Sequence, residues 1–249
     1  MALPEPFYEL GHHFAIDLPG ARAVFSTRRG GHSTGPYTSL NLGWLTDDEH
    51  SAVMRNRATL RSELGAPRLS FVHQVHGAEV RTITETRTPP TPRERPRLDG
   101  QATDQRDVAL CALTADCLPI AVAAGGGGAV AMLHAGWRGL AGGMIANGVQ
   151  AVRELRGDGE LTAAIGPGAG PCCYQVGEEV HAPFAAIDAA HAGRNLDLKA
   201  IARHQLREAG VAHVADIGIC TICSDPGLLF SHRRDRGITG RQAGVAWLT

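Results

Sequence analysis

The chain has few aromatic residues and no long apolar run. Phe, Trp and Tyr make up 5% of its 249 residues. No stretch approaches the roughly 18 consecutive apolar residues of a transmembrane helix. The N-terminal segment carries Pro, Glu and His where a secretory signal needs basic residues followed by an apolar stretch. We therefore expect a soluble, cytoplasmic protein that does not bind a membrane.

An excess of charge of one sign is also missing. The chain has 24 Lys and Arg against 25 Asp and Glu, which gives a formal net charge of −1. Nucleic acids and anionic membranes are bound through a strong positive field, so no nucleic-acid partner is expected. Hydrophobic residues make up 43% of the chain, enough to bury a substantial core, and this excludes disorder for most of it.

Cysteine is too sparse for a disulfide scaffold, with six residues in the whole chain. Thiols for metal binding or catalysis are the better expectation. Cys220 and Cys223 have CxxC spacing, but the adjacent Cys172 and Cys173 do not supply the second half of a zinc ribbon. We therefore interpret these four as partly buried thiols near the functional site.

The chain is interpreted as one domain over residues 1–249. A basic, proline-rich stretch at 87–98 predicts an exposed loop, because four prolines there remove backbone donors that a helix or central strand needs. The loop could divide two domains, but the composition does not change across it.

Hydrophobic periodicity predicts an α+β fold. Short apolar runs predict strands at 21–26, 69–75, 108–113, 118–124, 129–133, 163–165 and 214–220. Helical spacing predicts helices at 47–63, 140–155, 177–190 and 196–209. Asp47 or Asp48 is available to cap the first helix.

Three polar residues stand at the ends of strand-like runs: His76, Cys117 and His134. One thiolate and two imidazoles can hold zinc with a fourth position left open, which is typical of catalytic sites. Two other interpretations stay open. Cys117 could be a nucleophile with His134 as its base, or all three could be structural core residues. Strand alternation would turn His73 away from His76, so His73 is left out of the metal site.

Motifs spread from about residue 25 to the C-terminus resemble a known family. The sequence is similar to the laccase-domain proteins, also called the polyphenol oxidase or peptidoglycan editing factor family, which are related to FAMIN. The stretches that carry the resemblance are Gln74-Val-His-Gly77, Thr114-Ala-Asp-Cys-Leu-Pro119, His134-Ala-Gly-Trp-Arg-Gly139, Ile165-Gly-Pro-Gly168 and Phe230-Ser-His-Arg-Arg-Asp235. Asp99 and Thr103 also match a family pattern, with Gly100 in place of its alanine, and His232 stands where an aromatic residue is common.

The resemblance implies a single α+β domain with mixed sheets flanked by helices, in a fold like that of cytotoxic necrotizing factor. It implies a zinc site formed by His76, Cys117 and His134. It also implies a purine nucleoside phosphorylase acting on adenosine, inosine, guanosine and methylthioadenosine, with adenosine deaminase activity. Copper-dependent phenol oxidation is the older family label. One site with two histidines and one cysteine cannot hold four coppers, although copper could still replace zinc there.

The resemblance also suggests roles for the remaining site residues. A phosphate would need cationic contacts, for which Arg28, Arg138, Arg234 and Arg241 are candidates, although each could instead be structural. Asn41 and Gln74 could contact a purine edge. Asp116 could orient a ligand histidine or carry a proton, and it could equally be a turn cap.

Two further function classes are retained. The first is a metal-independent Cys-His hydrolase acting on a peptidoglycan precursor or amide, which would need Cys117 as a thiolate. The second is a partner-binding module in which zinc only stabilises the fold. For the leading interpretation, the expected ligands are purine nucleosides and phosphate, and the expected state is a monomer or weak homodimer.

Overall fold

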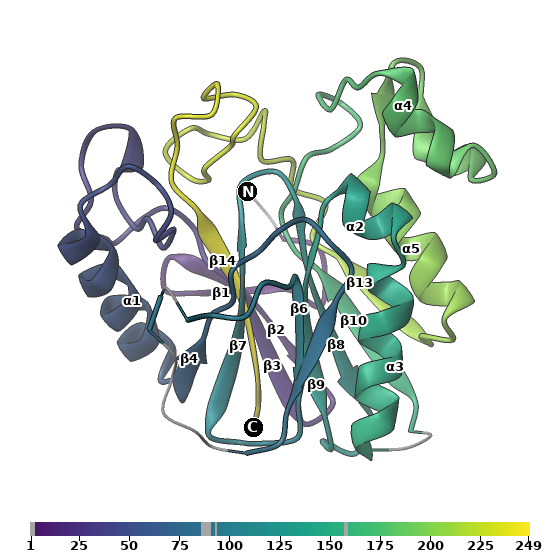
Figure 1. Cartoon of the computed structure of the whole chain (residues 1–249), viewed down its shortest axis with the longest axis horizontal. Helices are drawn as coiled ribbons and strands as arrows, with labels where there is room; N and C mark the ends of the chain where they lie inside the picture. The colour runs from purple at the N-terminus through teal and green to yellow at the C-terminus, as the bar shows by residue number, and fades with distance from the viewer. Residues whose placement is uncertain (1–2, 86–90, 93, 157–158) are drawn as a thin grey trace.

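The structure is a computed structural model that describes residues 3–85, 91–92, 94–156 and 159–249 (Figure 1). Two six-stranded sheets pack face to face, with α1 on the outer side of one sheet and α3 and α5 on the outer side of the other. The molecule is therefore a four-layer α-β-β-α sandwich. Both sheets contain parallel and antiparallel pairs, which confirms the predicted α+β class with mixed sheets.

The first sheet has the strand order β1-β2-β3-β14-β7-β4. Its strands are β1 (Tyr8–Leu10), β2 (His13–Leu18), β3 (Ala21–Phe25), β4 (Arg68–Ser70), β7 (Val108–Thr114) and β14 (Gln242–Leu248). Its outer face packs on helix α1 (His50–Leu64), where Leu60 and Leu64 are buried against the sheet. The C-terminal strand β14 thus lies in the middle of a sheet that begins with the N-terminal strands.

The second sheet has the order β13-β10-β8-β9-β6-β5. Its strands are β5 (Val80–Ile83), β6 (Gly100–Thr103), β8 (Leu118–Ala124), β9 (Val130–Ala135), β10 (Leu161–Ile165) and β13 (His213–Asp216). β8 is buried on both faces: Leu118 and Ile120 face the helices, and Ala121 faces the other sheet. Because alternate side chains of this strand are buried on opposite faces, its sequence is a continuous apolar run.

Several predicted elements are shorter than expected. The predicted helix at 140–155 is two helices, α2 (Trp137–Ala141) and α3 (Met144–Arg156), separated where Gly143 adopts a φ of +90°. The predicted helix at 177–190 is only α4 (Glu178–His181), followed by the 3₁₀ turns Ala182–Phe184 and Asp188–Ala190. Pro183 lies at the start of the first turn and provides no backbone N–H to continue a helix.

Other boundaries moved by a few residues. Helix α1 starts at His50 after Glu49, so neither Asp47 nor Asp48 is its N-cap residue. Helix α5 (Leu198–Glu208) is capped by Asp197, whose carboxylate accepts hydrogen bonds from the next turn. The remaining 3₁₀ turn is Gly35–Tyr37, and a small ribbon pairs β11 (His191–Ala192) with β12 (Asn195–Leu196).

The predicted strand at 69–75 was wrong beyond Ser70. After β4 the chain leaves the sheet, and residues 71–77 form a loop that contains a single bridge between His73 and Arg97. Residues 87–90 and 93 of the predicted proline-rich loop lie outside the described residues. Within the described ranges, no helix is long and apolar enough to cross a membrane.

The ends of several strands lie together at one edge of the sandwich. β7 ends at Thr114 in the first sheet, and a turn over residues 115–117 leads directly into β8 of the second sheet. β8 runs antiparallel to β9 and to β10, so its first residues lie beside the ends of both neighbours. Cys117 and His134, two of the three predicted donor residues, therefore lie at this edge, where the two sheets meet.

Candidate functional site

The side chains of His76, Cys117 and His134 converge at this edge. Their ligand atoms all lie within 4.8 Å of one another. The rings of the two histidines meet edge to face with their centroids 4.9 Å apart. His76 comes from the loop before β5, Cys117 from the turn before β8, and His134 from β9. Three residues far apart in the sequence thus form one compact group of donor atoms.

Asp99 is the residue that positions this group. Its carboxylate is 1% exposed and accepts hydrogen bonds from three consecutive backbone N–H groups, those of Val75, His76 and Gly77, at 2.7–3.2 Å. His76 has a φ of +60°, a conformation that non-glycine residues seldom adopt. The chain around His76 therefore forms a concave nest of N–H groups around a buried carboxylate.

The same carboxylate fixes the second histidine. His134 Nδ1 lies 2.8 Å from Asp99 Oδ1, and His134 is only 3% exposed. Because the carboxylate accepts a hydrogen bond from Nδ1, the other ring nitrogen of His134 is left to face Cys117 or a metal. In the sequence, Asp99 stands out only as part of a family pattern. A carboxylate that follows a proline-rich stretch gives no sign of its partner when that partner is 35 residues away.

The negative charge of the Cys117 thiolate and the positive charge of His134 stabilise each other. Burial opposes ionisation of both groups, but the positive charge of His134 lowers the pKa of the Cys117 thiol. In turn, the Cys117 thiolate and Asp99 raise the pKa of His134 above its usual range. The metal-free group is therefore a thiolate and an imidazolium near neutral pH, and the thiolate is the form that binds metals.

The donor set fits a zinc ion. Two imidazoles and one thiolate are common zinc ligands, and three protein ligands leave one tetrahedral position open. One histidine is held by a buried carboxylate, the arrangement that commonly orients zinc-binding imidazoles. All three residues line the cavity, so an ion held by them would be accessible from it. His73 also lines the cavity but does not belong to the converging group. It lies in the loop after β4, not in a strand, so strand alternation is not the reason that it lies apart.

The cavity beside the three residues has a volume of about 430 Å³, within the range of small-molecule sites. Aromatic rings and guanidinium groups make up much of its wall. The residues of these two kinds are Trp44, Trp137, Tyr174, Arg57, Arg95, Arg138, Arg233 and Arg241. Flat apolar faces suit a heteroaromatic ring, and clustered guanidinium groups suit an oxyanion.

Arg57 is a cavity residue without a predicted role. It is 6% exposed, and its Nη1 atom is buried without a hydrogen-bond partner. Its Nε and Nη2 atoms donate to the Leu42 carbonyl, and its guanidinium stacks on Phe71 at 3.9 Å from the ring centroid. Burial and the nearby charge of Arg95 lower the pKa of Arg57 to about 9. An anion at this wall would be attracted by the charges of Arg57 and Arg95 and would relieve the repulsion between them.

Asp116 lies next to Cys117 and lines the cavity. Its Oδ1 accepts a hydrogen bond from the Thr221 hydroxyl at 2.6 Å, and its Oδ2 accepts one from the Arg233 backbone N–H at 2.7 Å. The carboxylate that orients one of the two converging histidines is therefore Asp99, and Asp116 instead ties the turn before β8 to the C-terminal loops. Its φ of +94° helps to turn the chain at Cys117.

Three of the predicted substrate-contact residues line the cavity and three do not. Gln74, Arg138 and Arg241 lie in its wall. The side-chain amide of Gln74 donates to the Leu113 carbonyl and accepts from the Leu113 N–H, each at 2.8 Å. Arg241 donates from Nη1 to the carbonyls of Thr239 and Gly240. The exposed Arg138 lies over the ring of Trp137, 4.3 Å from its centroid.

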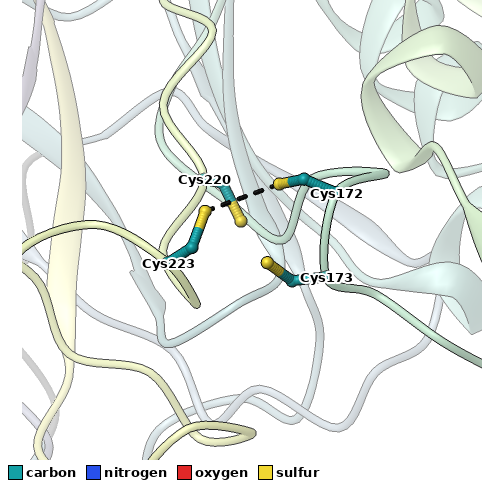
Figure 2. Close-up of side chains that lie close together, drawn as sticks. All are labelled: Cys172, Cys173, Cys220 and Cys223. Carbon is teal, nitrogen blue, oxygen red and sulfur yellow. Dashed lines mark hydrogen bonds between the residues drawn. The ribbon is translucent and has the colours of Figure 1, made fainter.

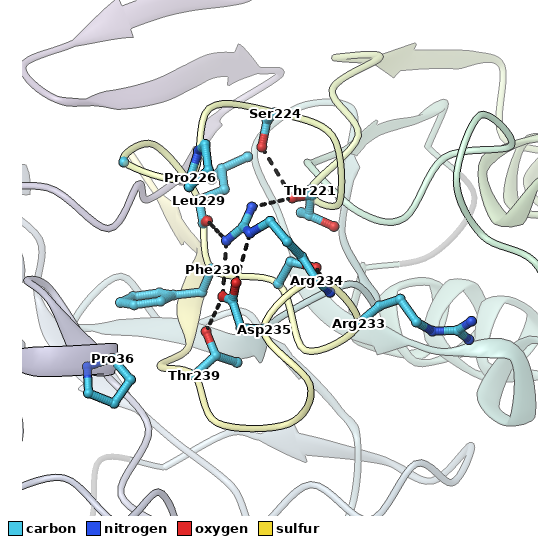
Figure 3. Close-up of polar contacts among 12 residues, drawn as sticks. Pro36, Thr221, Ser224, Pro226, Leu229, Phe230, Arg233, Arg234, Asp235 and Thr239 are labelled. Carbon is cyan, nitrogen blue, oxygen red and sulfur yellow. Dashed lines mark hydrogen bonds and ion pairs between the residues drawn. The ribbon is translucent and has the colours of Figure 1, made fainter.

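Asn41, Arg28 and Arg234 do not line the cavity and bond to nearby loops instead. The Asn41 amide oxygen accepts hydrogen bonds from the backbone N–H groups of Gly43 and Arg241. Arg28 donates to the carbonyls of Pro36, Thr38 and Pro226. Figure 3 shows Arg234 held between Thr221, Leu229 and Asp235, while Arg233 points away from that network.

A second cluster contains four cysteines. The sulfur atoms of Cys172, Cys173, Cys220 and Cys223 all lie within 4.8 Å of one another (Figure 2). The adjacent pair and the CxxC pair, which were not expected to form one site, therefore lie together. The two pairs follow β10 and β13, which are neighbouring parallel strands, so both loops leave the sheet at the same edge.

Comparison with known proteins agrees with this architecture. Residues 22–249 match the model of the family described as multi-copper polyphenol oxidoreductase laccase. The chain is 38% identical over 247 residues to purine nucleoside phosphorylase YlmD of Geobacillus stearothermophilus, covering 91% of this chain and 90% of the relative. It is 39% identical over 238 residues to purine nucleoside phosphorylase SCO2081 of Streptomyces coelicolor, with 92% and 96% covered.

A solved structure shows the same fold. The crystal structure of YlmD from Geobacillus stearothermophilus superposes with a TM-score of 0.86 at 33% sequence identity, covering 98% of this chain and 99% of that one. The resemblance drawn from the sequence motifs is confirmed, and the chain belongs to the multi-copper polyphenol oxidoreductase laccase family.

Proposed function

We propose that the protein is a zinc-dependent purine nucleoside phosphorylase with adenosine deaminase activity. One observation carries the proposal: the His76, Cys117 and His134 donors open on a cavity whose wall combines aromatic rings with five arginines. The names of its relatives support the same activity. Adenosine, inosine, guanosine and methylthioadenosine are the proposed nucleosides, phosphate is the second substrate, and the cytoplasm is the proposed location.

Phosphorolysis requires charge stabilisation in two places. A phosphate oxygen forms a bond to C1′ of the ribose while the glycosidic bond breaks, and the purine leaves with the bonding electrons and takes up a proton. Arg57, Arg95 and Arg138 would supply the positive charge that holds the phosphate, because all three line the cavity and the guanidinium groups of Arg57 and Arg95 lie together against Phe71. Trp44, Trp137 and Tyr174 would stack against the purine, and Asp116 could carry the proton.

Deamination needs a water activated beside the purine. Zinc, when bound, would supply a Lewis acid that makes a water acidic enough to attack near neutral pH. In the overall reaction a water oxygen would replace the amine on the purine carbon, and ammonia would leave. Asp99 would keep His76 and His134 in place throughout, because its buried carboxylate accepts hydrogen bonds from both segments. Copper could compete for the same donors.

Product analysis with adenosine tests the proposal. Zinc-loaded protein is incubated with adenosine, with and without phosphate, and the products are separated by chromatography. Adenine that forms only with phosphate is the expected result for phosphorolysis, and inosine that forms without phosphate is the expected result for deamination. Unchanged adenosine in both tubes would contradict both activities.

Arg138 offers a separate test of phosphate binding. Its exposed side chain can be shortened at little cost to the fold, so Arg138→Gln should retain its melting temperature and its zinc. We expect KM for phosphate to rise roughly tenfold or more, which corresponds to the loss of one charged hydrogen bond. Arg55→Gln, which removes an exposed arginine on α1 outside the cavity, is the matched control. Equal phosphate KM values in the two variants would remove Arg138 from the proposal.

A metal-independent Cys-His hydrolase is the alternative, and the ionised Cys117 and His134 pair favours it. Turnover of a peptidoglycan precursor that survives exhaustive chelation and is lost on thiol alkylation would support this alternative. The copper-dependent polyphenol oxidase has less support. Within the described part of the chain only one converging ligand group contains histidine, whereas a four-copper centre needs several such groups.

A further inference from the structure

The four-cysteine cluster is separate from the catalytic donors and unused by the proposed reaction. Cys172 and Cys173 lie in a turn of the loop after β10, and Cys220 and Cys223 lie in the loop after β13. In Figure 2 all four side chains point from two loops toward a common centre. Cys172 and Cys223 are exposed, while the other two are partly buried, so the cluster lies at the surface of the protein.

The spacing of the sulfur atoms suits a metal better than a disulfide. Tetrahedral zinc with four Zn–S bonds of about 2.3 Å places its sulfurs about 3.8 Å apart. The sulfurs of Cys172 and Cys223 are 3.5 Å apart, and all four lie within 4.8 Å of one another. A disulfide would join two of them and leave the other two without a role. A single ion at the centre would use all four.

The surrounding backbone is shaped for this cluster. The Gly170 N–H donates to the Cys220 sulfur at 3.2 Å, the kind of hydrogen bond that stabilises a thiolate. A Cβ at position 170 would lie 3.1 Å from Cys220 Cβ and 3.4 Å from the Cys172 sulfur. Glycine therefore allows the two loops to approach. A bridge between Gly168 and Cys220 joins the loops directly beneath the sulfurs.

A buried cation lies next to the cluster. Lys199 is 4% exposed, and its Nζ donates to the carbonyls of Ile219 and Gly168, one from each loop. Its charge also interacts with Cys220 and Cys172. Zinc bound by four thiolates carries a net charge of −2, so a neighbouring ammonium group would offset part of that charge.

We infer that Cys172, Cys173, Cys220 and Cys223 form a second, structural metal site that binds one zinc ion through four thiolates. Four protein ligands leave no open position, so this ion does not take part in chemistry. It joins two loops that build the catalytic cavity. Tyr174 lines that cavity one residue after Cys173, and Thr221, next to Cys220, donates its hydroxyl to Asp116.

Metal counting on the full chain tests the inference. Protein purified under reducing conditions from zinc-supplemented cells should contain about two zinc ions per chain, and the Cys172→Ser/Cys223→Ser double variant about one. Cys111→Ala is the control, because Cys111 is buried in β7 and belongs to neither cluster; it should keep both ions. An unchanged zinc content in the double variant would overturn the inference.

A second measurement does not depend on the folding of the double variant or on the proposed reaction. The Cys117→Ala protein keeps all four cysteines of the cluster but has lost the thiolate of the catalytic site. On titration with Co²⁺ it should develop an intense sulfur-to-metal charge-transfer absorption at about one equivalent. The absence of this band, or an intact mass showing the four cysteines paired as disulfides under the same reducing conditions, would overturn the inference.

Discussion

Cys117→Ala should lose the catalytic zinc and almost all turnover of adenosine, while the fold survives. The thiolate is one of the three proposed ligands, and alanine cannot replace it. Loss of a residue that merely orients a ligand typically weakens metal binding by about 10–100-fold, so loss of the ligand itself should weaken it more than about 100-fold. Activity should fall at least in proportion at limiting zinc. Metal analysis and product chromatography on the same samples measure both effects.

The control for this prediction is Cys111→Ala. Cys111 is a buried thiol in the neighbouring strand β7 and makes no contribution to either converging ligand group. Its replacement should leave zinc content and turnover near those of the unmodified protein. A zinc-free Cys117→Ala protein that turned over adenosine at the full rate would refute zinc-dependent catalysis. Thermal unfolding shows whether both variants are folded before activities are compared.

Asp99→Asn should produce the second large loss of metal affinity. Asp99 is a positioning residue: it holds His76 and His134 in place and is not itself one of the proposed metal ligands. An asparagine offers one amide oxygen where the carboxylate accepts hydrogen bonds from His134 and from three backbone N–H groups. Its NH₂ group would face those donors. We expect metal affinity to fall by about 10–100-fold, and stability to fall by about 1–3 kcal/mol from unsatisfied buried donors.

Competition with a chelator of known affinity measures the first effect, and thermal unfolding measures the second. Excess zinc should restore activity to Asp99→Asn but not to Cys117→Ala, which separates a positioning role from a ligand role. Asp17→Asn is the matched control, because Asp17 is an exposed carboxylate on β2 that pairs with Arg22. Asp99→Asn with unaltered zinc affinity would show that the carboxylate serves the fold alone.

The sequence predicted the three donors because each stands at the end of an apolar run and in a family motif. It did not predict how Asp99 links two of them, because that link depends on β6 and β9 pairing with Gly100 opposite Leu133. β6 itself was not predicted, since Gly-Gln-Ala-Thr has little of the apolar or β-branched character of a strand. The role of Asp99 therefore follows from the pairing of β6 with β9 and is not visible in the local sequence.

The arginines show a second limit of sequence reasoning. Arg28 and Arg234 were chosen because they lie in family-like motifs, yet their guanidinium groups bond to backbone carbonyls of neighbouring loops. Arg57 was not among the predicted contacts, because its position in the sequence does not show where its guanidinium lies. Only the packing of α1 against the first sheet shows that its guanidinium reaches the cavity with one donor unpaired. Long side chains cover several ångströms, so sequence position alone does not determine where their ends lie.

The turn over residues 115–117 connects the two sheets and also carries Cys117. Two of the donors thus belong to the rigid seam of the sandwich, with His134 within β9 and Cys117 directly before β8. Reshaping this seam would require two buried sheets to slide past each other, which close-packed interiors strongly resist. Adaptation to different nucleosides should therefore arise in the surface loops around Trp44, Tyr174 and His232, and the metal-binding donors should stay the same from one substrate to the next.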